Sequence, residues 1–154
     1  MIEHAPTQPL RLPMTRPQPA APLILVIDDS LTVRKIVEVT LQRADFAVLS
    51  FADGLTALRW LASAEATHPA LVLLDIELPG MDGYEVARYL RTLPRGVLTR
   101  LVMLSRRDGV VDRLKSRLVG AQEHLCKPFK VADLLAVVQA TLGLPTSPVK
   151  GGQR

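Results

Sequence analysis

Short apolar runs alternate with segments of helical periodicity through the middle of the chain. The runs lie at residues 23–28, 47–51, 70–74 and 100–105, and the short segment EHLCK at residues 123–127 is read as a fifth strand. Apolar positions recur at helical spacing within residues 30–44, 55–62, 82–93, 111–119 and 131–143. Continuous apolar runs of this length are typical of strands buried on both faces, and the wider spacing is typical of helices with one packed face.

The alternation predicts an α/β fold in which each strand is followed by a helix. Parallel strands need a crossover between them, so five such units favour a single parallel sheet covered by helices on both faces. Right-handed crossovers make this a doubly wound fold. Ser30 stands where the N-cap of the first helix belongs. We expect one domain over residues 23–143 of the 154-residue chain.

The two ends of the chain differ from this pattern. Residues 1–22 hold six of the twelve prolines and only scattered apolar positions, which predicts a disordered leader and no signal peptide. Residues 144–154 are expected to form a flexible tail. No apolar run approaches the roughly 18 residues of a membrane span. The single cysteine, Cys126, excludes an internal disulfide and fits a reducing cytoplasm, so we expect a cytoplasmic protein without a membrane partner.

The net charge of +4 raises the question of nucleic acid binding. Residues 23–142 carry 15 basic and 14 acidic residues, so the excess lies in the two ends. Within the domain the basic residues gather locally, at Arg106, Arg107, Arg113, Lys115 and Arg117. Such a helix face is usually only solvated, with a partner surface as the alternative. DNA binding is therefore disfavoured.

Polar residues stand at the ends of four predicted strands. Asp28 and Asp29 end the first strand, Asp75 the third and Ser105 the fourth, and the fifth runs into Lys127. Taken singly, each aspartate could cap a turn and the lysine could lie in an exposed loop. In an open α/β sheet, however, ligands bind outside the carboxyl ends of the strands. The combination therefore predicts a site at this edge.

The residue types indicate the chemistry of that site. Three crowded carboxylates repel one another unless a cation lies between them, and hard oxygen ligands suit Mg²⁺. An ammonium and a hydroxyl nearby would bind phosphoryl oxygens. The site therefore favours Mg²⁺-assisted phosphoryl transfer, in which positioning and charge neutralisation supply most of the catalysis. The chain has no glycine-rich nucleotide loop of either common type.

Four segments together closely resemble the receiver domain of bacterial two-component response regulators, which has a flavodoxin-like fold. They are LVIDDSLTVRKIVEVTL, LVLLDIELPGMDGYEVARYLR, VMLS and GAQEHLCKPF, and the likeness covers about residues 23–143. The resemblance implies that Asp75 accepts a phosphoryl group from a phosphohistidine of a sensor histidine kinase. It also implies Mg²⁺ held by Asp28, Asp29, Asp75 and the backbone carbonyl of Glu77.

The remaining roles also come from the resemblance. Ser105 and Lys127 would each contact a phosphoryl oxygen, and the bond before Pro128 is typically cis in this family. The position of His124 usually holds Tyr or Phe and acts with the hydroxyl residue as a switch. His124 could serve as a pH-sensitive version of that switch. Alternatively, it is simply a half-buried histidine at the end of a strand.

The stretch LSRRDGVVDRLKSRLVG is similar to stand-alone receivers of the twitching-motility and phototaxis type. Only eleven residues follow residue 143, so we expect no output domain within this chain. The implied output is a protein partner that binds the surface formed by the fourth helix, the fifth strand and the fifth helix.

Another class of function uses the same acceptor. A Mg²⁺-dependent aspartyl-phosphate hydrolase wants a second acid two residues after the nucleophile, and Glu77 has that spacing. The turn at Pro79 and Gly80 and the lack of a capping insertion count against it. Glu77 and Arg107 are also both expected beside the site. They either form an ion pair that obstructs the attacking water or point into solvent.

Overall fold

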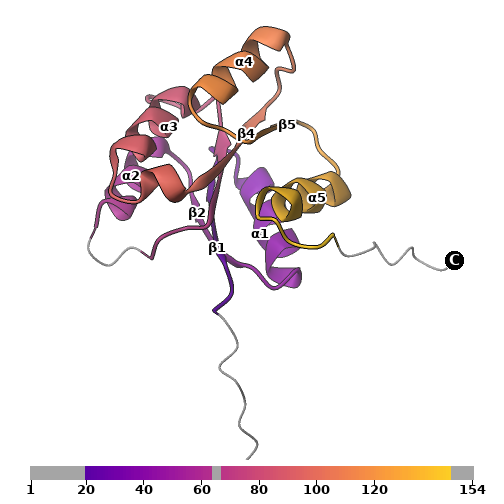
Figure 1. Ribbon diagram of the computed structural model, residues 1–154. Helices are drawn as coiled ribbons and strands as arrows, with labels where there is room; N and C mark the ends of the chain where they lie inside the picture. Colours follow the sequence, from indigo (N-terminus) through magenta and orange to yellow (C-terminus); the bar gives the residue numbers. More distant parts are fainter. Residues whose placement is uncertain (1–19, 64–66, 147–154) are drawn as a thin grey trace, which may run out of the picture.

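The computed structural model describes residues 20–63 and 67–146, which form one sheet with helices on both faces (Figure 1). The strands are β1 (Leu23–Ile27), β2 (Ala47–Phe51), β3 (Leu71–Asp75), β4 (Arg100–Ser105) and β5 (Glu123–Cys126). The helices are α1 (Leu31–Arg43), α2 (Gly54–Leu61), α3 (Gly83–Thr92), α4 (Val110–Leu118) and α5 (Val131–Thr141), with a 3₁₀ turn, η1 (Gly96–Leu98). All strand pairs are parallel in the order β2-β1-β3-β4-β5, which confirms the predicted doubly wound fold.

The ends of the elements lie close to the predicted positions. Ser30 caps α1, as predicted, because its side chain accepts a hydrogen bond from the Val33 amide at 3.3 Å. The third strand includes Asp75, which the apolar run alone did not, and α5 ends at Thr141 rather than at residue 143. The predicted disordered leader and flexible tail fall mostly outside the described residues.

Alternating strand residues supply the two halves of the core, because successive side chains of a strand point to opposite faces. On one face the strands pack against α2 and α3, through residues that include Leu25, Ile27, Leu74, Met103, Ala57 and Leu90. On the other face they pack against α1 and α5, through residues that include Ile24, Val26, Leu73, Leu104, Leu41 and Leu134. Figure 1 shows these helix pairs on opposite sides of the sheet.

Helix α4 departs from this arrangement. Ser116 is its one buried residue, while Val110, Leu114 and Leu118 are 84%, 55% and 78% exposed. The spacing of Leu114 and Leu118 correctly predicts a helix, which begins at Val110. Their apolar stripe nevertheless faces away from the core, so the pattern does not identify the face on which α4 packs.

Polar contacts hold α4 near its beginning and just past its end. In the first turn of the helix, the Tyr84 hydroxyl donates to the Asp112 carbonyl at 3.4 Å. At the turn after α4, the Arg91 guanidinium donates to the Gly120 carbonyl at 2.8 Å. The same guanidinium donates to the carbonyls of Gly96 and Thr99, each at 2.7 Å. Arg91 therefore joins α3, η1 and the α4–β5 turn.

Within residues 20–63 and 67–146, no helix combines the length and the apolar character needed to cross a bilayer.

Candidate functional site

The carboxyl ends of β1 and β3 bring three carboxylates together. Ile27 and Leu74 are register partners in neighbouring strands, so the residues that follow them, Asp28 and Asp75, meet at the sheet edge. Both are buried, at 0% and 4% exposure, whereas Asp29 beside them is exposed. Carboxylate oxygens of all three residues lie within 4.8 Å of one another. The acidic cluster predicted from the sequence is therefore present.

Lys127 reaches this cluster from the end of β5. Its Nζ lies 2.5 Å from Oδ2 of Asp28 and 3.2 Å from Oδ2 of Asp75. The other oxygen of Asp28 accepts the Ser30 amide proton at 2.9 Å, so one carboxylate orients both the lysine and the start of α1. The peptide bond between Lys127 and Pro128 is cis, in agreement with the resemblance.

The negative charge of the buried acidic cluster is only partly balanced by nearby positive charge. Burial is the main cause that raises the pKa of Asp75 to about 6, and the charge of Asp28 raises it further. Lys127 and the Glu77 amide, which donates to Asp75 Oδ1 at 3.1 Å, act in the opposite direction and only partly compensate. Carboxylate oxygens with uncompensated charge are the donors that Mg²⁺ prefers. Asp28, Asp29 and Asp75 could hold this ion.

Ser105 ends β4 beside the acidic cluster. Asp75 is the register partner of Leu104, the residue before Ser105. The serine is 1% exposed, and its Oγ accepts the Arg107 amide proton at 2.9 Å. Arg107 Nε lies 3.7 Å from the Glu77 carboxylate, so of the two alternatives left open by the sequence the ion pair is the one that forms. No described contact involves the Glu77 carbonyl, and its part in binding metal stays a prediction.

His124 links the loop after β4 to α4. Its Nε2 lies 3.0 Å from the Arg107 carbonyl, which can only accept, so Nε2 carries a proton in this contact. Its Nδ1 lies 3.1 Å from Oγ of Ser116 on α4. Sequence reasoning identified His124 but missed Ser116. No local signal marks that serine, because the turn between α4 and β5 is what brings the two side chains together.

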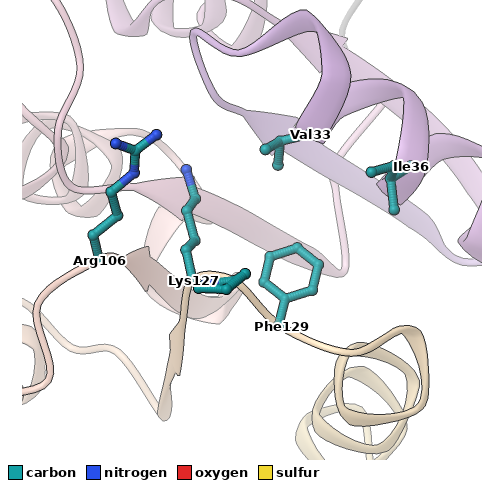
Figure 2. A pocket seen from close by; sticks show the side chains of 6 residues that line it. Val33, Ile36, Arg106, Lys127 and Phe129 are labelled. Atoms are coloured by element: carbon teal, nitrogen blue, oxygen red, sulfur yellow. The ribbon is translucent and has the colours of Figure 1, made fainter.

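Sequence reasoning did not place two arginines near the site, one of which, Arg106, it named only as part of the basic cluster. Arg34 on α1 donates to the Asp28 carbonyl at 2.6 Å. Arg106 lies beside Lys127 in a pocket of about 380 Å³, and Figure 2 shows the two charged ends pointing in the same direction. The other side chains that line the pocket are those of Val33, Ile36, Pro128 and Phe129. The cationic pair therefore stands beside an apolar wall.

Comparison with curated proteins reveals close relatives. Protein PilG of Pseudomonas aeruginosa is 36% identical over 117 residues, which cover 76% of this chain and 84% of PilG. The chain also matches transcriptional regulators at about half of their length.

Solved structures share the fold at the level of the whole domain. The chemotaxis protein CheY4 of Vibrio cholerae superposes with a TM-score of 0.74 at 30% identity, over 79% of this chain and 99% of CheY4. The receiver domain of a sensor histidine kinase from Pseudomonas aeruginosa superposes with a TM-score of 0.71 at 29% identity, over 80% of this chain and 99% of that one. That structure has a magnesium ion coordinated in its active-site cleft.

The model of the response regulator receiver domain matches residues 24–139, which include every residue of the site described above. The protein therefore belongs to the family of response regulator receiver domains.

Proposed function

We propose that this receiver domain is phosphorylated on Asp75 by a phosphohistidine of a sensor histidine kinase. The observation that carries the proposal is the placement of Asp75. Its carboxylate is buried beside Asp28, lies 3.2 Å from the Lys127 ammonium, and opens on the edge where Ser105 ends β4. A phosphoryl group on Asp75 would lie between a cation and a hydroxyl.

The chemistry divides among these side chains. A carboxylate oxygen of Asp75 forms the new bond to phosphorus as the bond from phosphorus to the donor imidazole breaks. Lys127 and Ser105 would bind phosphoryl oxygens as charge shifts onto them. Asp28, Asp29, Asp75 and, as predicted, the backbone carbonyl of Glu77 would hold Mg²⁺. The ion would neutralise further negative charge on the phosphoryl oxygens. The raised pKa of Asp75, about 6, still lies below 7, so most of the acceptor is ionised at neutral pH and can act as the nucleophile.

The pocket beside Lys127 supports the proposed donor. Its wall of Val33, Ile36 and Phe129 offers apolar contact, and Arg106 offers positive charge near the incoming phosphoryl group (Figure 2). A helix of the kinase that carries a phosphohistidine fits both features.

The output is proposed to run through His124 toward a downstream protein partner. When Ser105 turns toward the phosphoryl group, the Arg107 amide loses its acceptor, and the carbonyl of Arg107 is the partner of His124. The face of α4, β5 and α5 would then change, and its exposed Val110, Leu114 and Leu118 suit a protein partner.

The type of response regulator and its pathway are proposed from the similarity to known proteins. We infer that the receiver over residues 23–143 acts as a response regulator of the stand-alone type, with control of motility as its pathway. The likeness to a chemotaxis protein and to PilG supports this. The alternative of a hydrolase loses support, because the Glu77 carboxylate faces Arg107 and is 45% exposed.

Incubation with Mg²⁺ and acetyl phosphate, followed by intact mass, tests the proposal. Wild type should gain a single base-labile phosphoryl adduct, and Asp75→Asn should gain none. Asp29→Ala should lose most of the Mg²⁺-induced rise in melting temperature. An adduct on Asp75→Asn would overturn the assignment, and steady turnover of many donor equivalents would favour the hydrolase.

A further inference from the structure

A second group of side chains of metal-ligating types lies on the α4 side of β5, distinct from the Asp28, Asp29 and Asp75 carboxylates. His124 and Cys126 occupy alternate positions of β5 and so point to the same face of the sheet. Asp108, in the loop between β4 and α4, lies against them. One ligand atom from each of the three residues falls within 4.8 Å of the others. Asp108 is exposed and the other two are partly exposed, so an ion can reach the group from solvent.

The two clusters differ in chemistry. The cluster at Asp75 offers oxygen alone, whereas this one offers a carboxylate oxygen, an imidazole nitrogen and a thiol sulfur. Zn²⁺ selects nitrogen and sulfur ligands, and it commonly takes three protein ligands with water in the fourth position. We propose that Asp108, His124 and Cys126 form a second metal site, which binds Zn²⁺ and does not depend on Asp75.

The thiol lies near the Asp108 carboxylate in the structure. Burial, followed by the effect of this carboxylate, raises the pKa of the Cys126 thiol. Binding of Zn²⁺ displaces the proton of the Cys126 thiol, and the proton leaves to solvent. The charge of the thiolate is then neutralised by the cation rather than opposed by Asp108.

Two existing contacts compete with the metal. Arg113 bonds to Asp108 through Oδ1, with its Nε at 2.7 Å and its Nη2 at 2.6 Å. Both partners are more than half exposed, so this ion pair contributes little and Arg113 can swing into solvent. His124 must release one ring contact. If Nε2 leaves the Arg107 carbonyl for the metal, Nδ1 keeps Ser116, and such a contact orients a metal-bound histidine.

Cobalt provides the most direct test, because the chain has a single cysteine and a thiolate-to-cobalt absorption band can arise only from Cys126. The full-length protein is titrated with Co²⁺ in excess Mg²⁺, and the cobalt is then displaced with Zn²⁺. We expect an intense tetrahedral spectrum with a thiolate band that saturates near one ion per chain. Cys126→Ser should remove the band, and Asp108→Asn and His124→Asn should weaken binding by about a hundredfold.

Matched variants separate a built site from a reactive thiol. Asp75→Asn should bind Co²⁺ unchanged, and Arg113→Ala should bind it more tightly because the competing cation is gone. Asp108→Asn lies in an exposed loop, so its result is not confused with misfolding. The proposal is overturned if wild type shows no thiolate band, if the band saturates at half an ion per chain through a bridged dimer, or if it survives unchanged in both Asp108→Asn and His124→Asn.

Discussion

Helices α3 and α4 follow consecutive strands, yet they are attached to the sheet in different ways. The buried residues of α3 are Gly83, Val86, Ala87 and Leu90, and the close approach at Gly83 leaves no room for a Cβ, which would lie 2.3 Å from the Asp75 carbonyl. Helix α4 buries only Ser116 and relies on polar contacts to Tyr84, His124 and Arg91. The helix beside Asp75, the proposed phosphoacceptor, is thus fixed by packing, and the helix at the proposed output face is held mainly by hydrogen bonds.

The largest expected effect is on the free energy of unfolding, and it distinguishes the packed attachment of α3 from the polar attachment of α4. Leu90→Ala should lower the free energy of unfolding by about 2–5 kcal/mol, because it leaves a cavity at a residue that is 2% exposed. Leu118→Ala, at 78% exposure, should change it by no more than about 0.5 kcal/mol. Urea denaturation of both variants measures the difference. Equal losses would show that α4 is packed as firmly as α3.

A second prediction concerns the charge buried next to α3. The pKa of Asp75 is about 6 in the folded state against 3.8 for an unperturbed aspartate. The folded state therefore binds this proton more tightly than the unfolded chain does. Stability from this group is present below about pH 4 and is lost as the pH rises toward about 6, by at most about 3 kcal/mol. Asp75→Asn should lack that loss.

Urea denaturation without Mg²⁺ at several pH values measures this effect. The variant should exceed wild type by an amount that grows between about pH 4 and 6 and is constant above. Adding Mg²⁺ at neutral pH should narrow the difference, since the ion should stabilise wild type more than the variant, which lacks one of the three proposed carboxylate ligands. A difference that does not vary with pH would contradict the assigned cause.

The third prediction concerns the polar attachment of α4. His124→Phe removes the contacts to the Arg107 carbonyl and to Ser116, at a cost of about 1 kcal/mol. Because the loss is local, amide hydrogen exchange should rise by about fivefold in α4 and stay unchanged in α3. Glu123→Ala, a neighbouring exposed position, is the control. Equal increases in both helices would mean that α4 does not open by itself.

The smallest expected effect lies at the surface between the two regions. Glu77→Ala and Arg107→Ala should each speed loss of the phosphoryl group by at most about fivefold, because an exposed ion pair obstructs the attacking water only weakly. The double variant should be no faster than the faster single one, and Arg117→Ala should match wild type. Decay followed by intact mass gives the rates, and identical rates in all variants would exclude a gate.

The contrast between α3 and α4 also explains how far sequence reasoning reached. Continuous apolar strands specify their own burial, and a carboxylate at a strand end is placed by the sheet, so the meeting of Asp28, Asp75 and Lys127 could be predicted from the order of residues alone. The stripe of Leu114 and Leu118 predicts a helix, but whether a neighbour covers the stripe depends on packing between distant segments. The links of His124 to Ser116 and of Asp108 to Cys126 arise only from that packing.

The hydrogen bond from Arg91 to the Gly120 carbonyl fixes the C-terminal end of α4 relative to α3. The fixed point, the Gly120 carbonyl, lies just beyond the C-terminal end of the helix. The loop that contacts Ser105 lies at the opposite end. Leu118 lies close to this fixed point, whereas Val110 lies about 12 Å further along the helix axis. Any tilt of α4 therefore moves Val110 through a wide arc while Leu118 barely shifts. A small rearrangement beside Asp75 would therefore cause a larger displacement at Val110, in the proposed output face.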